Sequence, residues 1–588
     1  MNSKQSFRFV VMGALFTIIG ILIVGRMIRI QTGPEKEVFR EQGELYSSES
    51  YDMIPDRGKI YDRWGHLLAG NETVYVIGVN MWKRPNPETI ALAASVVLGS
   101  DYNQILAALS REPSNDYAFY VLDNYGTSEE VEQLGKLMTE MEDNPFTSGT
   151  SSDGSLHSLR GLEFEPYQQR VYPEKNLASN VLGFVNREPI SVYGIESYFD
   201  ELLSGVAKEY WVPMDPNRAT ELPDTTEGAS LILTIDREIQ SVTEEILDGA
   251  IEQNGALGGT IVIMHPKTGE ILAMASSPRL NINEYWRVSE VFEEEQVFNL
   301  AIHSYEPGSV FKVFTMASAL DSGTVEPDTT FIDTGVIQVG GVPIYNWNRG
   351  AWGPQTMLGC MQHSLNVCLA WVSTQMGAAQ FYDYLKAFGF GHPTGIELDL
   401  EVSGHLKLPG DSDWYEADLG TNAFGQGISV TPVQMLMAVS AIANDGQMVA
   451  PRIVRGVVDR ERQYNTSVQI TGTPISADTA HTLTDMLAVS LESEASVALV
   501  PGYRVAGKTG TAEIPTPGGY TSNMTNASFV GWGPVDDPQF IVYIWLEKPT
   551  SSPWGSVVAA PVFSEVVKRL VILMNLPPDP IRQSMTNP

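Results

Sequence analysis

Cysteine and histidine are scarce in this chain. Only 2 cysteines and 8 histidines occur among its 588 residues. Two cysteines cannot make a four-thiolate zinc site or a disulfide-rich scaffold. The histidines form no ligand motif of the type His-Glu-x-x-His. The sequence therefore predicts a protein that works without a metal ion or another cofactor.

Positive charge is also in short supply. Lys and Arg together number 37 against 71 Asp and Glu, which gives a formal net charge of −34. Binding to nucleic acid needs clustered Lys and Arg to neutralise phosphates, so a nucleic-acid partner is excluded. The chain is nevertheless 43% hydrophobic, which excludes a disordered acidic polymer. Its length predicts two or more domains.

Long apolar runs are limited to one, at the N-terminus. Phe9 to Gly25 are 17 residues without a charge, and snorkelling of Arg26 extends the run to Ile28. A core helix would have a polar face, and a signal peptide would end at small residues; neither feature is present. We expect an uncleaved membrane anchor at 9–28 after a cytoplasmic tail at 1–8. With two basic residues on each side, the positive-inside rule gives almost no preference for either orientation of the anchor. The short N-terminal tail favours an extracytoplasmic location for the rest of the chain.

The two cysteines, Cys360 and Cys368, are candidates for a disulfide in an exported protein. Both fall in a stretch that reads as one helix, Met357 to Met376. Eight helical residues separate two Cα atoms by about 12 Å, beyond the roughly 7 Å that a disulfide tolerates. The sequence therefore favours buried free thiols that pack beside the segment between them.

Composition changes along the chain and predicts two folded parts. The first is irregular, with an exposed Ser/Thr/Gly-rich loop at Thr147 to Ser155. The second begins with a strand and an amphipathic helix, continues with a β-hairpin and mainly helical patterns at 309–390 and 431–444, and ends with strands and a helix. It reads as one α/β domain whose sheet pairs N-terminal with C-terminal strands. The expected elements are Ser230–Ile235, Arg237–Asn254, Gly259–Met264, Glu270–Ser276, Ala527–Val535, Phe540–Leu546 and Val562–Met574. The expected parts are 29–225 and 226–575, followed by a tail at 576–588.

The first chemical signal is a serine followed three residues later by a lysine. Pro307 and Gly308 form a turn, so Ser309 starts the apolar helix that follows, and Lys312 lies on the same helical face. Backbone amides at a helix start favour a developing oxyanion. A lysine can activate a serine hydroxyl only if burial or nearby positive charge lowers the pKa of its amine. Alone, the pair favours a serine helix cap followed by an exposed lysine.

Two further signals follow in the chain. Ser364 and Asn366 can direct a hydroxyl and an amide into one cleft, although alone they read as a helix cap. Lys508-Thr509-Gly510-Thr511 follows a strand entry and offers a cation and hydroxyls to a carboxylate, with a glycine that permits close approach of a substrate. Lys267-Thr268-Gly269 repeats the tripeptide in a hairpin turn, where we expect no catalytic role.

Taken in order, Ser-x-x-Lys, Ser-x-Asn and Lys-Thr-Gly are the motif set of penicillin-binding proteins and serine β-lactamases. The chain resembles the class B penicillin-binding proteins over nearly its whole length. Further matches are Pro55–Ala69, Arg170–Pro173, Gly183–Val185, Gly194–Glu196, Phe424–Gly427 and Phe529–Trp532. Trp64 stands where the family usually has Asn. The resemblance implies a membrane-anchored α+β dimerisation or pedestal module, followed by an α/β transpeptidase domain of the serine β-lactamase type.

The resemblance also implies a role for each site residue. Ser309 attacks the carbonyl between the terminal D-alanines of a peptidoglycan stem peptide, and Lys312 takes its proton. Ser364 and Lys508 relay a proton to the leaving D-alanine. Asn366 holds the peptide amide, and the strand of Thr509, Gly510 and Thr511 binds the terminal carboxylate. β-Lactams acylate the same serine.

Several alternatives stay open at this level. Glu416 to Asn422 departs from the deacylation motif of β-lactamases by two positions and reads as a loop, which favours a transpeptidase over a hydrolase. Glu142–Phe146 superficially matches a glycosyltransferase motif without its continuation, so a separate membrane-embedded glycan polymerase is the expected partner. Glu306 before Pro-Gly-Ser favours a division enzyme, acting with divisome proteins, over an elongation enzyme. A low-affinity β-lactam resistance or sensor protein, and a non-catalytic scaffold, are the remaining hypotheses.

Overall fold

The computed structural model describes residues 3–33, 36–38, 48–53, 55–84, 86–143, 157–206, 208–213, 227–292, 296–516 and 519–586. The expected loop at Thr147 to Ser155 lies outside these residues. Contacts divide the chain into two compact units, one of residues 1–57 and 204–228 and one of residues 58–203 and 229–588. Each unit is described by itself.

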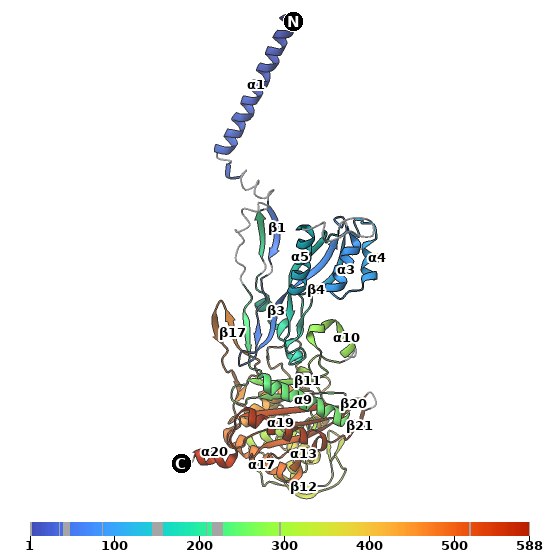
Figure 1. Cartoon of the computed structure of the whole chain (residues 1–588). Coiled ribbons are helices and arrows are strands. Elements are labelled where there is room, and N and C mark those ends of the chain that lie inside the picture. The colour runs from blue at the N-terminus through green and yellow to red at the C-terminus, as the bar shows by residue number, and fades with distance from the viewer. Residues whose placement is uncertain are drawn as a thin grey trace. The chain divides into compact units, whose positions relative to one another are not determined.

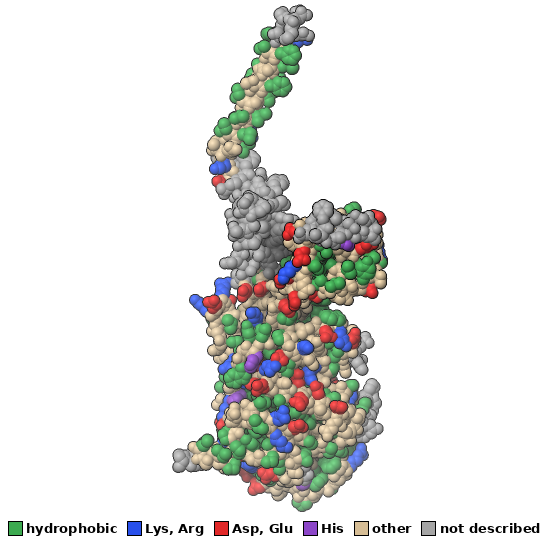
Figure 2. All heavy atoms as spheres, in the orientation of Figure 1, with side chains coloured by type: hydrophobic (Ala, Val, Ile, Leu, Met, Phe, Trp, Pro, Cys, Tyr) green, Lys and Arg blue, Asp and Glu red, His purple; other side chains and the backbone are tan. Residues whose placement is uncertain are grey.

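The smaller unit contains the N-terminal apolar helix, α1 (Ser3–Thr32), and a two-stranded antiparallel ribbon of β1 (Ser48–Met53) and β8 (Lys208–Pro213). Within Phe7–Thr32 of α1, an 18-residue stretch has a mean hydropathy of 2.5, and none of that stretch is buried. Figure 2 shows hydrophobic side chains along the length of α1 and charged ones only near its ends. By length and composition this helix can cross a membrane.

The core of the larger unit is a five-stranded antiparallel sheet in the order β11-β10-β22-β21-β20 (Figure 1). It pairs the first strands of the domain with the last ones, as the sequence predicts. Its strands are β10 (Gly258–Met264), β11 (Ile271–Ser277), β20 (Ala506–Thr516), β21 (Gly519–Gly533) and β22 (Phe540–Glu547). Hydrophobic side chains alternate between its two faces, because successive strand residues point to opposite sides.

Helices cover both faces of this sheet. On one face, Ile261 and Ile263 pack with α9 (Arg237–Asn254) and α19 (Ala560–Leu573). On the other, Val262 and Met264 pack with a helical layer that contains α11 (Lys312–Asp321), α16 (Pro432–Ala443) and α17 (Ala477–Glu494). Helix α9 has the predicted bounds, because Asp236 caps its first amides and Gly255 ends it in a left-handed conformation. The α/β sandwich of the catalytic domain is thereby confirmed.

The first predicted helical region, 309–390, contains more extended structure than predicted. Four short strands interrupt the helical pattern expected over 309–390. They are β12 (Thr330–Asp333), β13 (Val336–Val339), β14 (Val342–Tyr345) and β15 (Gly353–Thr356), in two antiparallel pairs. Beyond them the chain returns to helix in α12 (Met357–Gln362), α13 (Asn366–Met376) and α14 (Ala378–Ala387).

A second sheet joins the N-terminal module to the catalytic domain. Its order is β18-β17-β9-β2-β3-β4, with β5 also paired to β3. Strand β2 (Ile60–Tyr61) runs parallel to β9 (Ser230–Leu233), so a strand of the module lies beside the first strand of the later domain. The other strands are β3 (Leu67–Asn80), β4 (Phe119–Gly126), β5 (Leu162–Val171), β17 (Val454–Asp459) and β18 (Arg462–Asn465).

Among its described residues, the module has six helices and a small core of its own. The helices are α3 (Pro87–Val97), α4 (Tyr102–Leu109), α5 (Ser128–Asp143), α6 (Ser179–Leu182), α7 (Gly194–Tyr198) and α8 (Asp200–Ser204), of which α3, α4 and α5 contribute to the small core. Ile77 and Val79 of β3 pack against Ile90 of α3 and Leu134 of α5. Helices α3 and α5 thus pack on the antiparallel strands β3, β4 and β5. This is the α+β arrangement expected for the pedestal.

Trp64, which departs from the family pattern, has a definite place. Its indole Nε1 donates to Asp236 Oδ2 at 2.7 Å, and the Arg63 guanidinium lies 5.5 Å from its ring centroid. Asp236 is the residue that caps α9. The substitution thus links the turn after β2 to the start of a catalytic-domain helix.

Candidate active site

The turn that carries Ser309 lies directly against the edge of the five-stranded sheet. Ser309 is half-buried in a short 3₁₀ turn, η4 (Gly308–Phe311), which continues into α11. Gly308 has φ +60°, and a Cβ there would lie 2.6 Å from the Thr511 carbonyl oxygen. Its amide donates to the carbonyl of Gly425 at 3.0 Å. Only glycine permits this close stacking of the serine turn on β20.

Lys312 is completely buried, and its amine reaches the second motif. Its Nζ lies 2.6 Å from the Ser364 carbonyl oxygen, 3.1 Å from Ser364 Oγ and 2.8 Å from Asn366 Oδ1. Its Cα is three residues from Ser309, a spacing at which side chains lie on one face of a 3₁₀ or α-helical turn. The structure therefore brings the first two predicted motifs together around the Lys312 amine.

Burial lowers the pKa of Lys312 well below its usual value, and the positive charge of Lys508 lowers it further. Burial is the larger cause, because an amine surrounded by protein loses the hydration that stabilises its charged form. The neutral amine can act as an acceptor for a hydroxyl proton. A lowered pKa is the condition under which a lysine can activate a serine hydroxyl.

Ser364 lies at a sharp break between α12 and α13. Its φ is +52°, a left-handed conformation that reverses the chain between the two helices. The amide of Leu365 donates to the Cys360 carbonyl at 3.0 Å and closes the turn. Asn366 begins α13 and donates from Nδ2 to the Tyr345 carbonyl at 3.2 Å. Both polar side chains are thus fixed by local backbone geometry.

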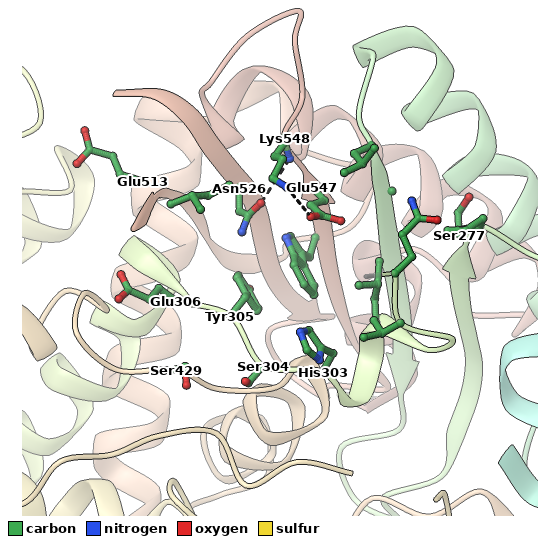
Figure 3. A pocket seen from close by; sticks show the side chains of 18 residues that line it. Ser277, His303, Ser304, Tyr305, Glu306, Ser429, Glu513, Asn526, Glu547 and Lys548 are labelled. Atoms are coloured by element: carbon green, nitrogen blue, oxygen red, sulfur yellow. Dashed lines mark hydrogen bonds and ion pairs between the residues drawn. The ribbon is translucent and has the colours of Figure 1, made fainter. Parts of the chain in front are cut away.

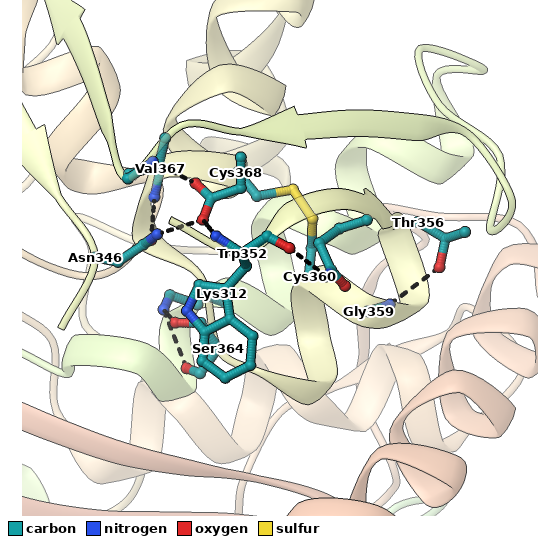
Figure 4. The surroundings of a disulfide bond; sticks show 12 residues. Lys312, Asn346, Trp352, Thr356, Gly359, Cys360, Ser364, Val367 and Cys368 are labelled. Atoms are coloured by element: carbon teal, nitrogen blue, oxygen red, sulfur yellow. Dashed lines mark hydrogen bonds between the residues drawn. A yellow bond between two sulfur atoms is a disulfide. The ribbon is translucent and has the colours of Figure 1, made fainter. Parts of the chain in front are cut away.

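The expectation of free thiols is wrong. Cys360 and Cys368 form a disulfide with a Cα–Cα separation of 6.1 Å. A continuous helix would hold them about 12 Å apart, but the left-handed Ser364 ends α12 and turns α13 back toward it. Figure 4 shows the sulfur bridge beside the segment that carries Ser364, with the Lys312 amine next to that serine. The position of the cysteines around the motif is as predicted; their chemistry is different.

The third motif lies on β20, for which the described residues provide a strand partner on one side only, β21. Lys508, Gly510 and Ala512 are buried, while Thr509, Thr511 and Glu513 are half-exposed. This alternation is the period of a strand, so the two threonines share one face. Thr511 Oγ1 accepts from the Gly555 amide at 3.0 Å, which fixes one of them.

Lys508 and Gly510 point inward from the same strand. Lys508 is 4% exposed, and its Nζ donates to the Thr509 carbonyl at 3.1 Å. A Cβ at Gly510 would meet Ser528 Oγ at 2.2 Å and Val310 Cγ1 at 2.9 Å. The strand can therefore approach the serine turn this closely only with glycine at 510.

A buried polar network that the sequence did not predict holds the second motif. Asn346 Oδ1 accepts from the Val367 amide at 3.1 Å, and Asn346 Nδ2 donates to Asp333 Oδ2 at 2.7 Å. Both side chains are almost fully buried. They fix the first turn of α13 from the strand layer. No local pattern marks them, because Asp333 ends β12 and Asn346 follows β14, so both precede the motif by many residues.

Two other sequence expectations can be compared with the structure. Lys267 is partly exposed and paired with Asp537, and Gly269 has φ +70°, so the second Lys-Thr-Gly is a hairpin turn as predicted. Glu416 to Asn422 is a helix, α15 (Glu416–Asn422), and the loop prediction is wrong. The Asp418 side chain accepts from the Tyr415 amide at 2.7 Å and so caps the first turn of that helix. In the part of the chain that the structure describes, no cluster of three or more metal-ligating side chains is present.

Known proteins share this arrangement. Residues 259–568 match the family model described as the penicillin binding protein transpeptidase domain, and residues 52–220 match the penicillin-binding protein dimerisation domain. The chain belongs to the penicillin-binding protein transpeptidase family, and its dimerisation domain makes it a class B member. Its enzyme class is that of serine-type peptidoglycan D,D-transpeptidases.

Individual relatives agree with this assignment. The chain is 29% identical to stage V sporulation protein D of Bacillus subtilis, over 94% of this chain and 84% of the relative. It is 27% identical to the peptidoglycan D,D-transpeptidase FtsI homolog of Mesostigma viride, over 72% of this chain and 75% of the relative. The crystal structure of penicillin-binding protein 2X from Streptococcus thermophilus is similar with a TM-score of 0.73 at 25% identity, covering 89% of this chain and 80% of that one.

Proposed function

We propose that this enzyme cross-links stem peptides through an acyl-enzyme on Ser309, with Lys312 as the base. The observation that carries the proposal is the buried Lys312 amine, held within 3.1 Å of Ser364 Oγ and with its pKa lowered. Transfer of the Ser309 proton to a neutral amine makes the hydroxyl nucleophilic. The bond formed joins Ser309 Oγ to the carbonyl carbon of the penultimate D-alanine.

The other motif residues serve the leaving group and the substrate. Ser364 and Lys508 pass a proton to the amine of the terminal D-alanine as its bond to the acyl group breaks. Asn366 Nδ2 and Oδ1 hold the peptide amide, and Thr509 and Thr511 bind the terminal carboxylate. Gly510 lets the donor peptide lie close to β20, and the backbone amides of Ser309 and Thr511 stabilise the oxyanion. The amine of a second stem peptide then attacks the acyl-enzyme and releases Ser309.

Covalent labelling by a fluorescent penicillin tests the nucleophile. Ser309→Ala should abolish labelling, because no other atom can form the ester. Ser496→Ala, at an exposed serine outside the site, is the matched control and should label like the wild type. Undiminished labelling of Ser309→Ala would falsify the assignment.

For the cellular role we propose septal cell-wall synthesis. The Glu306-Pro-Gly-Ser context and the Gly194-Ile195-Glu196 segment support a division-type enzyme over an elongation-type enzyme. Such an enzyme works with a membrane-embedded glycan polymerase and divisome proteins. The test is the position of a fluorescent fusion and the shape of depleted cells: septal signal and filaments are expected, whereas lateral signal and round cells contradict the proposal.

For the topology we propose a single-pass protein with a cytoplasmic tail at 1–8, an anchor at 9–28, a pedestal at 29–225, an extracytoplasmic catalytic domain at 226–575 and a tail at 576–588. The Cys360–Cys368 disulfide supports this orientation, because disulfides persist in oxidising compartments outside the cytoplasm. A periplasmic-type reporter such as an exported phosphatase, fused after the catalytic domain, should be active; an inactive fusion contradicts the orientation.

A further inference from the structure

A line of aromatic side chains, which we call the aromatic track, runs between the N-terminal module and the catalytic domain. Each ring contacts the next, with centroid distances of 4.5 to 6.5 Å. Its members, in order, are Tyr125, Trp286, Tyr285, Phe184, Phe298 and Tyr193. Tyr125 belongs to β4, and Trp286 belongs to a 3₁₀ turn after the first hairpin of the catalytic domain, η2 (Ile282–Arg287). These residues lie outside the catalytic motifs, and the proposed function gives them no role.

The outer end of the aromatic track is open to solvent. Trp286 is 56% exposed and Tyr125 is 39% exposed, and their ring centroids are 6.4 Å apart. Because burial of a large ring is strongly favourable, an exposed tryptophan beside an exposed tyrosine is the kind of apolar surface that marks a binding site.

The rings at this end are held in place from below. Tyr285 stacks on the buried Phe184 with an angle of 14° between the ring planes, and its hydroxyl accepts from the Arg187 amide at 3.0 Å. Trp286 meets Tyr285 edge to face, at 77°. A surface whose side chains are already ordered loses less conformational entropy when a ligand binds.

The inner end of the aromatic track reaches the cavities that lead to the serine turn. Tyr193 and Phe298 stack with a centroid distance of 4.5 Å and line a cavity of about 230 Å³. This cavity shares three lining residues with a cleft of about 600 Å³, namely Gln296, Val297 and His303. Figure 3 shows that cleft, with Ser277 at one end and Glu306, three residues before Ser309, at the other. The aromatic track is therefore continuous with the catalytic region through shared walls.

Charges beside the open end of the aromatic track are already paired. Arg287 lies 2.8 Å from Glu284 and 2.8 Å from Glu290, and the Asp123 carboxylate accepts from the Tyr125 amide at 2.8 Å. The whole chain, at a formal net charge of −34, repels polyanions. The ligand that fits is a neutral one with apolar faces and polar edges.

Rings of N-acetylated amino sugars have this chemistry. The flat face of a sugar ring presents C–H groups of partial positive charge, which the negative face of an aromatic ring attracts. Its hydroxyl and acetamide groups point sideways and stay in water. The enzyme class acts on peptidoglycan, in which stem peptides are attached to glycan strands of such sugars. A single line of rings also matches a linear polymer better than it matches the broad apolar core of a protein interface.

We propose that the aromatic track is a docking site for the glycan strand of peptidoglycan, with Trp286 and Tyr125 stacked on its sugar rings. The proposal rests on the peptidoglycan substrate and is independent of the role of Ser309. A strand held there keeps its stem peptides near the cleft that leads to the serine turn. The effective concentration of stem peptides at the catalytic motifs rises as a result.

The test measures binding of glycan strands from which an amidase has removed the stem peptides, so that the catalytic motifs have no peptide to bind. The full-length protein in detergent is titrated with these strands by calorimetry. Trp286→Ala should weaken binding about fivefold, as for the loss of one aromatic contact. Trp286→Phe keeps a ring and should retain most of the affinity. Trp82→Ala, which removes a tryptophan of the module that is 61% exposed, is the matched control and should bind like the wild type.

Penicillin acylation of all three variants should proceed at the wild-type rate, because the substituted side chains do not belong to the catalytic motifs. Equal binding by Trp286→Ala and Trp82→Ala overturns the proposal, and this is the result expected if the aromatic track serves a protein partner instead. A wild type that does not bind peptide-free strands also overturns it. Slower acylation by Trp286→Ala would contradict it as well, since the substitution would then act through the fold of the catalytic site.

Discussion

At the scale of single residues, the chemistry depends on how Lys312 is buried. A surface lysine remains protonated at neutral pH and cannot accept a proton from serine. Here the amine is enclosed by the Ser364 turn and α13, and Lys508 adds a like charge from the sheet edge. The sequence predicts these partners from motif order alone. It does not give the burial, which depends on helices and strands distant in the chain.

Penicillin acylation should therefore depend on pH through the Lys312 amine. The rate should rise as this amine loses its proton, at a pH well below the usual pKa of lysine. Lys508→Gln removes a like charge, so the pKa of Lys312 should rise. The acidic limb of the pH–rate profile for acylation should then move to higher pH. Stopped-flow acylation from pH 5 to 10, at constant ionic strength, measures this shift.

Lys267→Gln is the control for that series, because it changes the lysine of the other Lys-Thr-Gly sequence. Lys267 lies in a hairpin turn and pairs with Asp537. The acidic limb of the pH–rate profile of Lys267→Gln should coincide with that of the wild type. If the limb of Lys508→Gln also coincided with it, the charge of Lys508 would not lower the pKa of Lys312.

At the scale of elements, the decisive feature is the break between α12 and α13. The apolar pattern from Met357 to Met376 is compatible with one helix, and no proline interrupts it. The break is at Ser364, whose left-handed φ is stabilised by the disulfide and by the bonds around Asn346. These constraints are tertiary, and for that reason the sequence alone led to the wrong prediction that the two cysteines are free thiols. Helix α15 differs, because its cap is a local bond between Asp418 and the Tyr415 amide, three residues apart.

Removal of the disulfide should loosen the turn that carries Ser364. Closing a loop with a sequence separation of 8 restricts the unfolded chain by about 2.5 kcal/mol. Cys360→Ala with Cys368→Ala should lower the free energy of unfolding by about this amount and slow penicillin acylation. Chemical unfolding and labelling kinetics measure the two effects.

Reductant provides the internal control for this prediction. Treatment of the wild type with a phosphine should reproduce the double variant, and the double variant should not respond. If acylation by the wild type is equally fast after verified reduction of the bond, the disulfide does not position the motif.

At the scale of the whole molecule, the N-terminal module is held together by polar contacts between its own segments. Two of its signatures, which lie 26 residues apart in the sequence, meet in a buried ion pair. Arg170 Nε donates to Glu196 Oε1 at 2.6 Å, and Arg170 Nη1 donates to Asn71 Oδ1 at 3.0 Å. Tyr172 also donates to Glu196, at 3.3 Å. The sequence predicts the signatures but not their contact, since neither segment has a periodicity that indicates a partner.

Arg170→Met should destabilise the protein strongly. The side chains of Arg170 and Glu196 are only 2% and 0% exposed, so loss of the cation leaves a buried carboxylate. Breaking such a pair typically costs about 3–5 kcal/mol. Urea unfolding measures the change. Lys136→Met removes one member of an exposed pair with Glu132 and should leave the transition unmoved. A transition for Arg170→Met that coincides with that of Lys136→Met would contradict the prediction.

The pairing of β2 with β9 has a consequence for recombination between related genes. Residues 60–61 supply the neighbouring strand for residues 231–232, so the later domain needs a piece of the earlier one to complete its own edge. A catalytic segment cut out at residue 229 would carry an open strand that other chains could occupy. Recombination between genes of this family should therefore exchange 58–203 and 229 onward as one block, and chimeras that separate them should be found in the insoluble fraction.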